Sequence, residues 1–140
     1  MSTDDAIPEA IRREQMTLIE AIARLEENLG DATVGRMQAE LLAIQRVVRT
    51  HFAQEESGFL RSLRAAMPER EADALALEAD HDRLRGALQS LLDRLTADTI
   101  ESRAQLDEDI RSWIRAARDH EAQETHLLQE TFQRDIGAAD

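Results

Sequence analysis

Apolar residues recur in steps of three and four along four separate stretches of the chain, and this pattern restricts the possible folds more than any other feature. In the first stretch the stripe consists of Ile11, Leu18, Ile22, Leu25 and Leu29. Such spacing is typical of helices that bury one face in a bundle. The other stripes are Leu41, Ile44, Val48 and Phe59; Leu77, Leu84, Leu88, Leu91 and Leu95; and Leu106, Ile110, Trp113, Ala117 and Leu127. We therefore predict an all-α fold with four amphipathic helices.

Proline, glycine and short polar segments separate the four stretches. Proline suits the first turn of a helix and cannot continue one, and threonine is a good N-cap. The expected helices run from Pro8 to Gly30, from about Thr33 to Ala66, from about Glu69 to Leu95, and from an N-cap at Thr99 to Gly137. Short connections make successive helices antiparallel neighbours. We expect one domain, residues 1–140, folded as an up-down-up-down four-helix bundle.

Composition and charge exclude several classes of function. The 140 residues contain no cysteine, which removes disulfides and thiolate metal sites and is compatible with a cytoplasmic location. The net charge of -12 argues against nucleic acid or an anionic membrane as a partner, because both need a basic surface. The first residues, MSTDDAIPEAI, lack the basic and apolar regions of a signal peptide. No apolar run approaches the length of a membrane span. We expect a cytoplasmic protein.

Polar residues interrupt every apolar stripe, and two of the interruptions repeat. The segment HFAQEESGFL, residues 51–60, resembles HEAQETHLLQ, residues 120–129, and each contains His-x-x-x-Glu. Residues 10–25 also align with residues 76–91, so the chain reads as two copies of one helical hairpin. In that alignment Gln15 takes the place of His81.

The interrupting residues are expected at one level of the bundle. With a rise of about 1.5 Å per residue, counting from each turn places the four helix positions at nearly the same height. A histidine and a glutamate four residues apart share a helix face. Buried carboxylates are costly unless something neutralises them, and a metal ion does so. Imidazole and carboxylate together suit iron, manganese or zinc, and bridging carboxylates favour a two-metal site. The predicted metal residues are Gln15, His51, Glu55, His81, His120 and Glu124.

These motifs, HFAQEE, LEADH and HEAQE, resemble the hemerythrin-like (HHE cation-binding) family over essentially the whole chain. The resemblance implies a four-helix bundle with a non-haem di-iron centre. It implies that Glu55 and Glu124 bridge the irons, that His81 and His120 hold one iron, and that His51 holds the other. It also implies binding or sensing of oxygen, nitric oxide or iron, with a small diatomic molecule or peroxide as ligand.

The chain departs from the family pattern at Gln15, where the family has a histidine. An amide oxygen is a weaker ligand than imidazole. We therefore expect the iron on the Gln15–His51 side to be held weakly, or to be absent so that the centre is mono-iron. Reversible oxygen carriers have a further histidine where this chain has Arg85. We expect Trp113 to be ordinary core and His126 to face solvent. Glu56 and Glu121 adjoin predicted ligands and could serve as reserve carboxylates, but we expect surface roles for both.

Three functions fit these features. The first is an iron protein that binds or senses a small ligand, whose sensory output would need an unidentified protein partner. The second is an enzyme, an iron oxidase or peroxidase with an open coordination position on the Gln15 side. The third is a metal-poor structural bundle. Metal content separates the third from the others, and turnover separates the second from the first.

Overall fold

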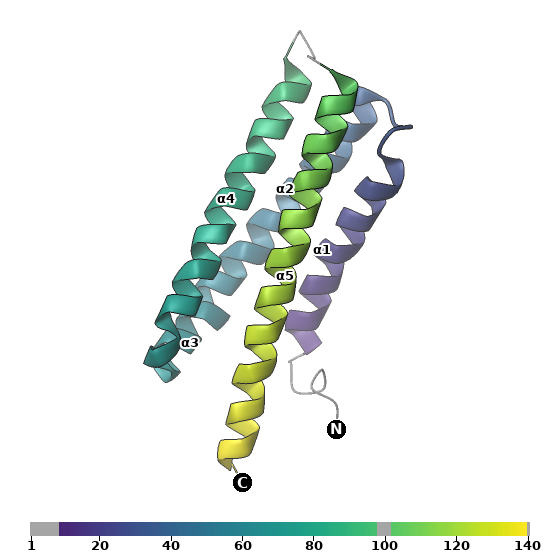
Figure 1. Ribbon diagram of the computed structural model, residues 1–140. Helices are drawn as coiled ribbons and strands as arrows, with labels where there is room; N and C mark the ends of the chain where they lie inside the picture. The colour runs from purple at the N-terminus through teal and green to yellow at the C-terminus, as the bar shows by residue number, and fades with distance from the viewer. Residues whose placement is uncertain (1–8, 98–101, 140) are drawn as a thin grey trace.

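The computed structural model describes residues 9–97 and 102–139, with side chains as far as Thr131. Four helical segments lie antiparallel along one axis, and the second of them is divided into two helices (Figure 1). The helices are α1 (Glu9–Asn28), α2 (Val34–Ser57), α3 (Phe59–Ala66), α4 (Glu71–Thr96) and α5 (Arg103–Ala139), and the short 3-10 turn η2 (Pro68–Arg70) precedes α4. Helix α1 packs against α2 and α5, and α4 packs against the same two helices, so the bundle forms a closed ring of neighbours. No strand occurs in these residues. The predicted all-α, up-down-up-down bundle is confirmed.

Local signals explain where α1 ends and α2 begins. Gly30 has a positive φ of 93°, a left-handed conformation that glycine adopts at little cost. Thr33 is the N-cap of α2, and its side chain accepts a hydrogen bond from the backbone N–H of Arg36 at 3.1 Å. Pro8, predicted in the first turn of the first helix, and Thr99, the predicted N-cap of the last, lie outside the described residues. Helix α5 continues through Gly137 to Ala139, slightly beyond the predicted end.

The prediction of one unbroken helix from Thr33 to Ala66 was wrong, because the helix is interrupted at Gly58. There the backbone N–H still bonds to the carbonyl of Gln54 at 2.9 Å, but φ and ψ leave the helical region. A Cβ at Gly58 would lie 2.8 Å from the Gln54 carbonyl oxygen, so only glycine fits without a shift. Helix α3 begins at the next residue, Phe59, one helical turn after Glu55.

The predicted stripes form the core, which is divided into two apolar clusters. The larger contains residues of α1, α2, α4 and α5 from Leu18 to Ala117, and the smaller contains Leu60, Leu63, Met67, Ala74, Leu77 and Leu127. Between them the same helices contribute a layer of buried polar side chains. No helix within the described ranges has the length and apolar character needed to cross a membrane.

Candidate metal centre

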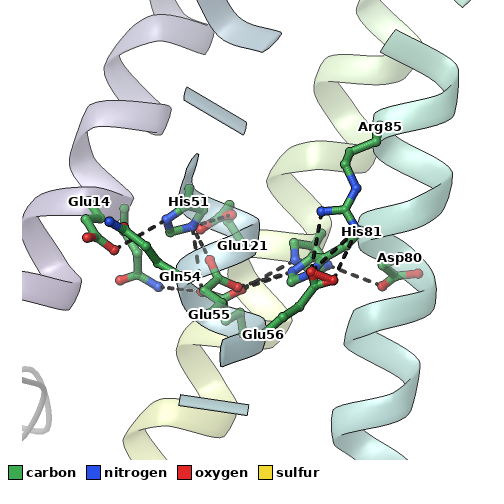
Figure 2. Close-up of polar contacts among 12 residues, drawn as sticks. Glu14, His51, Gln54, Glu55, Glu56, Asp80, His81, Arg85 and Glu121 are labelled. Atoms are coloured by element: carbon green, nitrogen blue, oxygen red, sulfur yellow. Dashed lines mark hydrogen bonds and ion pairs between the residues drawn. The ribbon is translucent and has the colours of Figure 1, made fainter. Parts of the chain in front are cut away.

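The polar layer contains five of the six predicted metal residues as buried histidines and glutamates. Helix α2 provides His51 and Glu55, and α4 provides His81 (Figure 2). Helix α5 provides His120 and Glu124. Each is at most 5% exposed. The i, i+4 spacing on α2 and on α5 directs both members of each pair to the bundle axis. Segments far apart in the sequence therefore place their imidazoles and carboxylates at one level.

Two groups of side chains in this layer have ligand atoms close enough to hold a cation. The first is Glu55, His81, His120 and Glu124, and the second is His51, Glu55, Glu121 and Glu124, with the ligand atoms of each group within 4.8 Å of one another. Glu55 and Glu124 belong to both groups. His81 Nε2 lies 3.2 Å from Glu55 Oε2, and His120 Nε2 lies 3.4 Å from Glu124 Oε2. The two shared carboxylates thus lie between the imidazoles of His81 and His120 on one side and the single imidazole of His51 on the other.

Many of these buried atoms have no hydrogen-bond partner among the described residues. They include both ring nitrogens of His51 and His81, Nε2 of His120, both oxygens of Glu55 and Glu121, and Oε2 of Glu124. A folded protein rarely leaves so many polar atoms unsatisfied at one place, because each costs free energy. Cations between them would use the same nitrogens and oxygens as ligands. The donor set therefore fits metal ions.

The three histidines share one orientation, with Nε2 toward the layer and Nδ1 toward an outer carboxylate. The Nδ1 distances are 3.4 Å from His120 to Asp80 Oδ2, 3.7 Å from His81 to Glu56 Oε1, and 3.9 Å from His51 to Glu14 Oε2. Outer carboxylates of this kind fix the tautomer and ring orientation of metal-binding histidines. The arrangement turns each Nε2 toward the interior, where it could bind a metal ion once the ring has given up its proton.

The outer carboxylates are held in turn by other side chains (Figure 2). Arg85 pairs with Glu56 at 3.1 Å, and Arg83 pairs with Asp80. The Gln54 amide nitrogen, in the orientation that satisfies its hydrogen bonds, donates to Glu14 Oε2 at 3.0 Å. The sequence suggested a surface role for Glu56. The structure shows instead that Glu56 links Arg85 to the buried His81.

Aromatic rings enclose the layer on the α4–α5 side. Phe52 stacks on His81 with 3.9 Å between ring centroids and 8° between ring planes. Trp113 is buried in the larger core cluster and donates its indole N–H to the carbonyl of Leu84 at 3.0 Å. The prediction that Trp113 is core is confirmed. The stacked ring of Phe52 restricts the rotation of His81 and keeps water from its face.

The layer carries strong electrostatic coupling in the cation-free protein. Burial disfavours the charged form of His51, but the nearby carboxylates of Glu121 and Glu55 favour it more strongly and raise the pKa to about 10. Burial likewise opposes the charge on His81, yet the nearby carboxylates of Glu124 and Glu55 raise its pKa to about 9. Protons on these rings thus take the place that cations would take.

The two carboxylates shared by both groups differ from each other. Burial opposes the charge on Glu55, but its contacts with Glu124, His51 and His81 lower its pKa to about 2. Burial and the neighbouring carboxylate of Glu55 raise the pKa of Glu124. One carboxylate therefore keeps its negative charge while the other retains a proton more readily.

Gln15, the sixth predicted residue, is buried beside the layer but turns its amide nitrogen toward it. Its Nε2 donates to Glu124 Oε1 and to Thr125 Oγ1, each at 3.4 Å. In this orientation the side chain is a hydrogen-bond donor to a carboxylate.

The expectation of a surface role for Glu121 was wrong. Glu121 is only 6% exposed, and its Oε1 lies 3.4 Å from His51 Nε2. The sequence favoured a surface role over that of a reserve carboxylate because Glu121 follows His120 directly, about 100° away around the helix, and lies off the main stripe. The signal was its place beside a predicted ligand. His126 behaves as expected, with a 73% exposed side chain that pairs with Glu130.

The fold and this layer define a helical bundle that surrounds a buried set of cation ligands. A family model described as the hemerythrin HHE cation binding domain matches residues 6–132. The chain belongs to this family, as the sequence motifs predicted. No match was found among curated proteins or among solved structures.

Proposed function

We propose that this chain is a non-haem iron protein that binds or senses oxygen, nitric oxide or iron through a carboxylate-bridged di-iron centre. The observation that carries the proposal is the set of three buried imidazoles that turn Nε2 toward two shared carboxylates. Imidazole and carboxylate together suit iron, and two shared carboxylates suit a pair of cations. Membership of a cation-binding family supports the same conclusion.

Each residue has a defined task in this proposal. Glu55 and Glu124 would bridge the two irons, His81 and His120 would hold one, and His51 would hold the other. Bound iron supplies a redox-active Lewis acid that coordinates a diatomic molecule or peroxide. The outer carboxylates orient the imidazoles, and Phe52 excludes water from His81.

Two clefts bring the surface close to the layer. One, of about 350 Å³, is lined by Glu14, Thr17, Thr50 and His51, and another, of about 700 Å³, is lined by Asp80, Trp113 and His120. Both exceed the size of a diatomic molecule or peroxide by a wide margin. These clefts support access of a small ligand from either side of the bundle.

Anaerobic loading with Fe(II) tests the proposal. The expected result is iron retained after gel filtration, followed by a change in the absorption spectrum when oxygen or nitric oxide is added. His120→Ala, which removes one imidazole, should lose both responses, whereas His126→Ala should keep them. Iron-free protein after loading would contradict the proposal and favour a metal-poor structural bundle.

One observation also favours an enzyme of the iron oxidase or peroxidase type. Glu121 brings a third buried carboxylate to the layer, and extra negative charge stabilises Fe(III) relative to Fe(II). Continued consumption of Fe(II) or peroxide over many turnovers would support the enzyme. A stable stoichiometric adduct would support the binding protein.

A further inference from the structure

Glu121 is a buried charge for which the family resemblance offers no role. It lies on α5 directly after His120, is 6% exposed, and has no hydrogen-bond partner for either oxygen within the described chain. A carboxylate placed there only as a neighbour of His51 would cost more in desolvation than one contact returns. Its Oε1 lies 3.4 Å from His51 Nε2, the atom that also faces Glu55. Glu121 therefore points at the place where a cation beside His51 would sit.

Gln15, by contrast, is oriented for another task. An amide nitrogen donates hydrogen bonds and has no lone pair for a metal, and Gln15 directs this nitrogen at Glu124 and Thr125. The bond to Glu124 Oε1 fixes one oxygen of a shared carboxylate. Gln15 thus acts as a positioning residue for Glu124.

We propose that Glu121, rather than Gln15, completes the cation position beside His51. The inference rests on the proposed function, because it names the ligands of the same centre. The position beside His51 then has one imidazole and the carboxylates of Glu55, Glu121 and Glu124. The position beside His81 has two imidazoles and the two shared carboxylates. The chain replaces a missing imidazole with a carboxylate from a different helix.

Charge supports this assignment. Two divalent cations bring four positive charges to a layer that water does not reach easily, and an unbalanced buried charge is costly. Glu55 and Glu124 supply two negative charges, and Glu121 supplies the third. The carboxylate-rich position should also discriminate less against Mn(II) than an imidazole-rich one, because carboxylate oxygens suit that ion.

Counting the iron bound per chain tests the inference without any measurement of activity. Apoprotein is titrated anaerobically with Fe(II), and the bound metal is measured after gel filtration. The unaltered chain should hold two irons. Glu121→Gln should hold one and weaken the second site at least about 100-fold, since loss of a ligand should exceed the 10–100-fold effect of an outer partner. Gln15→Ala removes a positioning residue and no ligand, so it should still hold two irons, with a smaller loss of affinity than Glu121→Gln.

Matched variants separate the effect of ligation from that of charge or folding. Asp119→Asn removes the same charge two residues away on the exposed face of α5 and should hold two irons. Glu121→Asp keeps the charge but shortens the side chain, so it should weaken the second site while circular dichroism shows the same helix content. Two equally tight irons in Glu121→Gln, or loss of one iron in Gln15→Ala alone, would overturn the inference while leaving iron binding intact. Absence of iron in the unaltered chain would instead overturn the proposed function.

Discussion

The two sides of the polar layer have the same outer arrangement and different inner donors. On the α4–α5 side, His81 and His120 present two imidazoles, and on the α1–α2 side His51 presents one beside Glu121. All three histidines turn Nδ1 toward an outer carboxylate. The ring orientation is thus the same on both sides, while the ligand atoms differ.

The outer contacts also differ in strength. Asp80 is 21% and Glu56 28% exposed, and an arginine holds each, whereas Glu14 is 39% exposed and is held by an uncharged amide. Electrostatic contacts weaken as water reaches them. The α4–α5 side is therefore the more rigid half. The α1–α2 side is the half whose ligands depart from the family pattern.

The largest expected effect comes from removing an imidazole of the rigid half. His81→Ala or His120→Ala should abolish tight iron binding, and with it the rise in melting temperature that iron produces, because only the folded state binds the ion. At iron concentrations about 100-fold above the dissociation constant that rise corresponds to about 2.7 kcal/mol. Differential scanning calorimetry with and without Fe(II) measures it. If His126→Ala lost as much metal, the assignment of His120 would fail.

A separate effect is expected from pH on the protein without bound metal. The raised pKa values of His51 and His81, about 10 and 9, contribute stability that is complete below about pH 6.5 and lost as pH rises toward 10. The raised pKa of Glu124 acts in the same direction. The free energy of unfolding should therefore fall as pH rises from 6.5 to 10, because the folded protein must give up protons that the unfolded chain has already lost.

The lowered pKa of Glu55 sets the acid limit of the same profile. Its contribution is present above about pH 4.5 and lost as pH falls toward 2. Urea titrations of apoprotein from pH 3 to pH 10 should therefore show maximal stability near pH 5 to 6. A flat profile between pH 6 and pH 9 would mean that the imidazoles and carboxylates do not interact in the absence of metal.

The outer carboxylates provide a test of the difference in rigidity. Asp80→Asn should weaken iron binding about 10–100-fold, because an amide orients His120 less firmly than a carboxylate does. Glu14→Gln should have a smaller effect, since Glu14 is more exposed and lies 3.9 Å from His51. Asp93→Asn, on the exposed face of α4, is the control. Equal losses in the Asp80 and Glu14 variants would contradict the comparison.

The sequence predicted what depends on helical periodicity. The stripes that contain Leu18, Ile44, Leu88 and Ile110 are buried, and five predicted ligands meet at one level, because antiparallel helices of equal rise fix height along the axis. Height along the axis is therefore readable from residue counts and turns.

Residue counts and turns did not predict the rotation of each helix around its axis or the local breaks in the backbone. Whether Glu121 faces the layer or solvent depends on how α5 is rotated against α1 and α2, which the stripe defines only to within a wide arc. The break at Gly58 was missed because a single glycine is tolerated inside a helical pattern. The direction of the Gln15 amide depends on which acceptor oxygens of α5 pack against it, and the sequence does not specify this packing.

The smallest expected effect is that of Gln15→His, which restores the imidazole of the family pattern. If Glu121 already completes the position beside His51, a new imidazole adds a donor to a position that already holds its cation, so iron content should stay at two per chain. The affinity should change only a few-fold, roughly 1 kcal/mol or less, because the gain of a nitrogen is offset by loss of the hydrogen bond to Glu124. The preference should move from Mn(II) toward Zn(II), since imidazole suits zinc. Competitive titrations with the two metals measure this shift. A rise from one iron to two in Gln15→His would show instead that the amide had left the α1–α2 side incomplete, and that Glu121 does not take the place of the missing histidine.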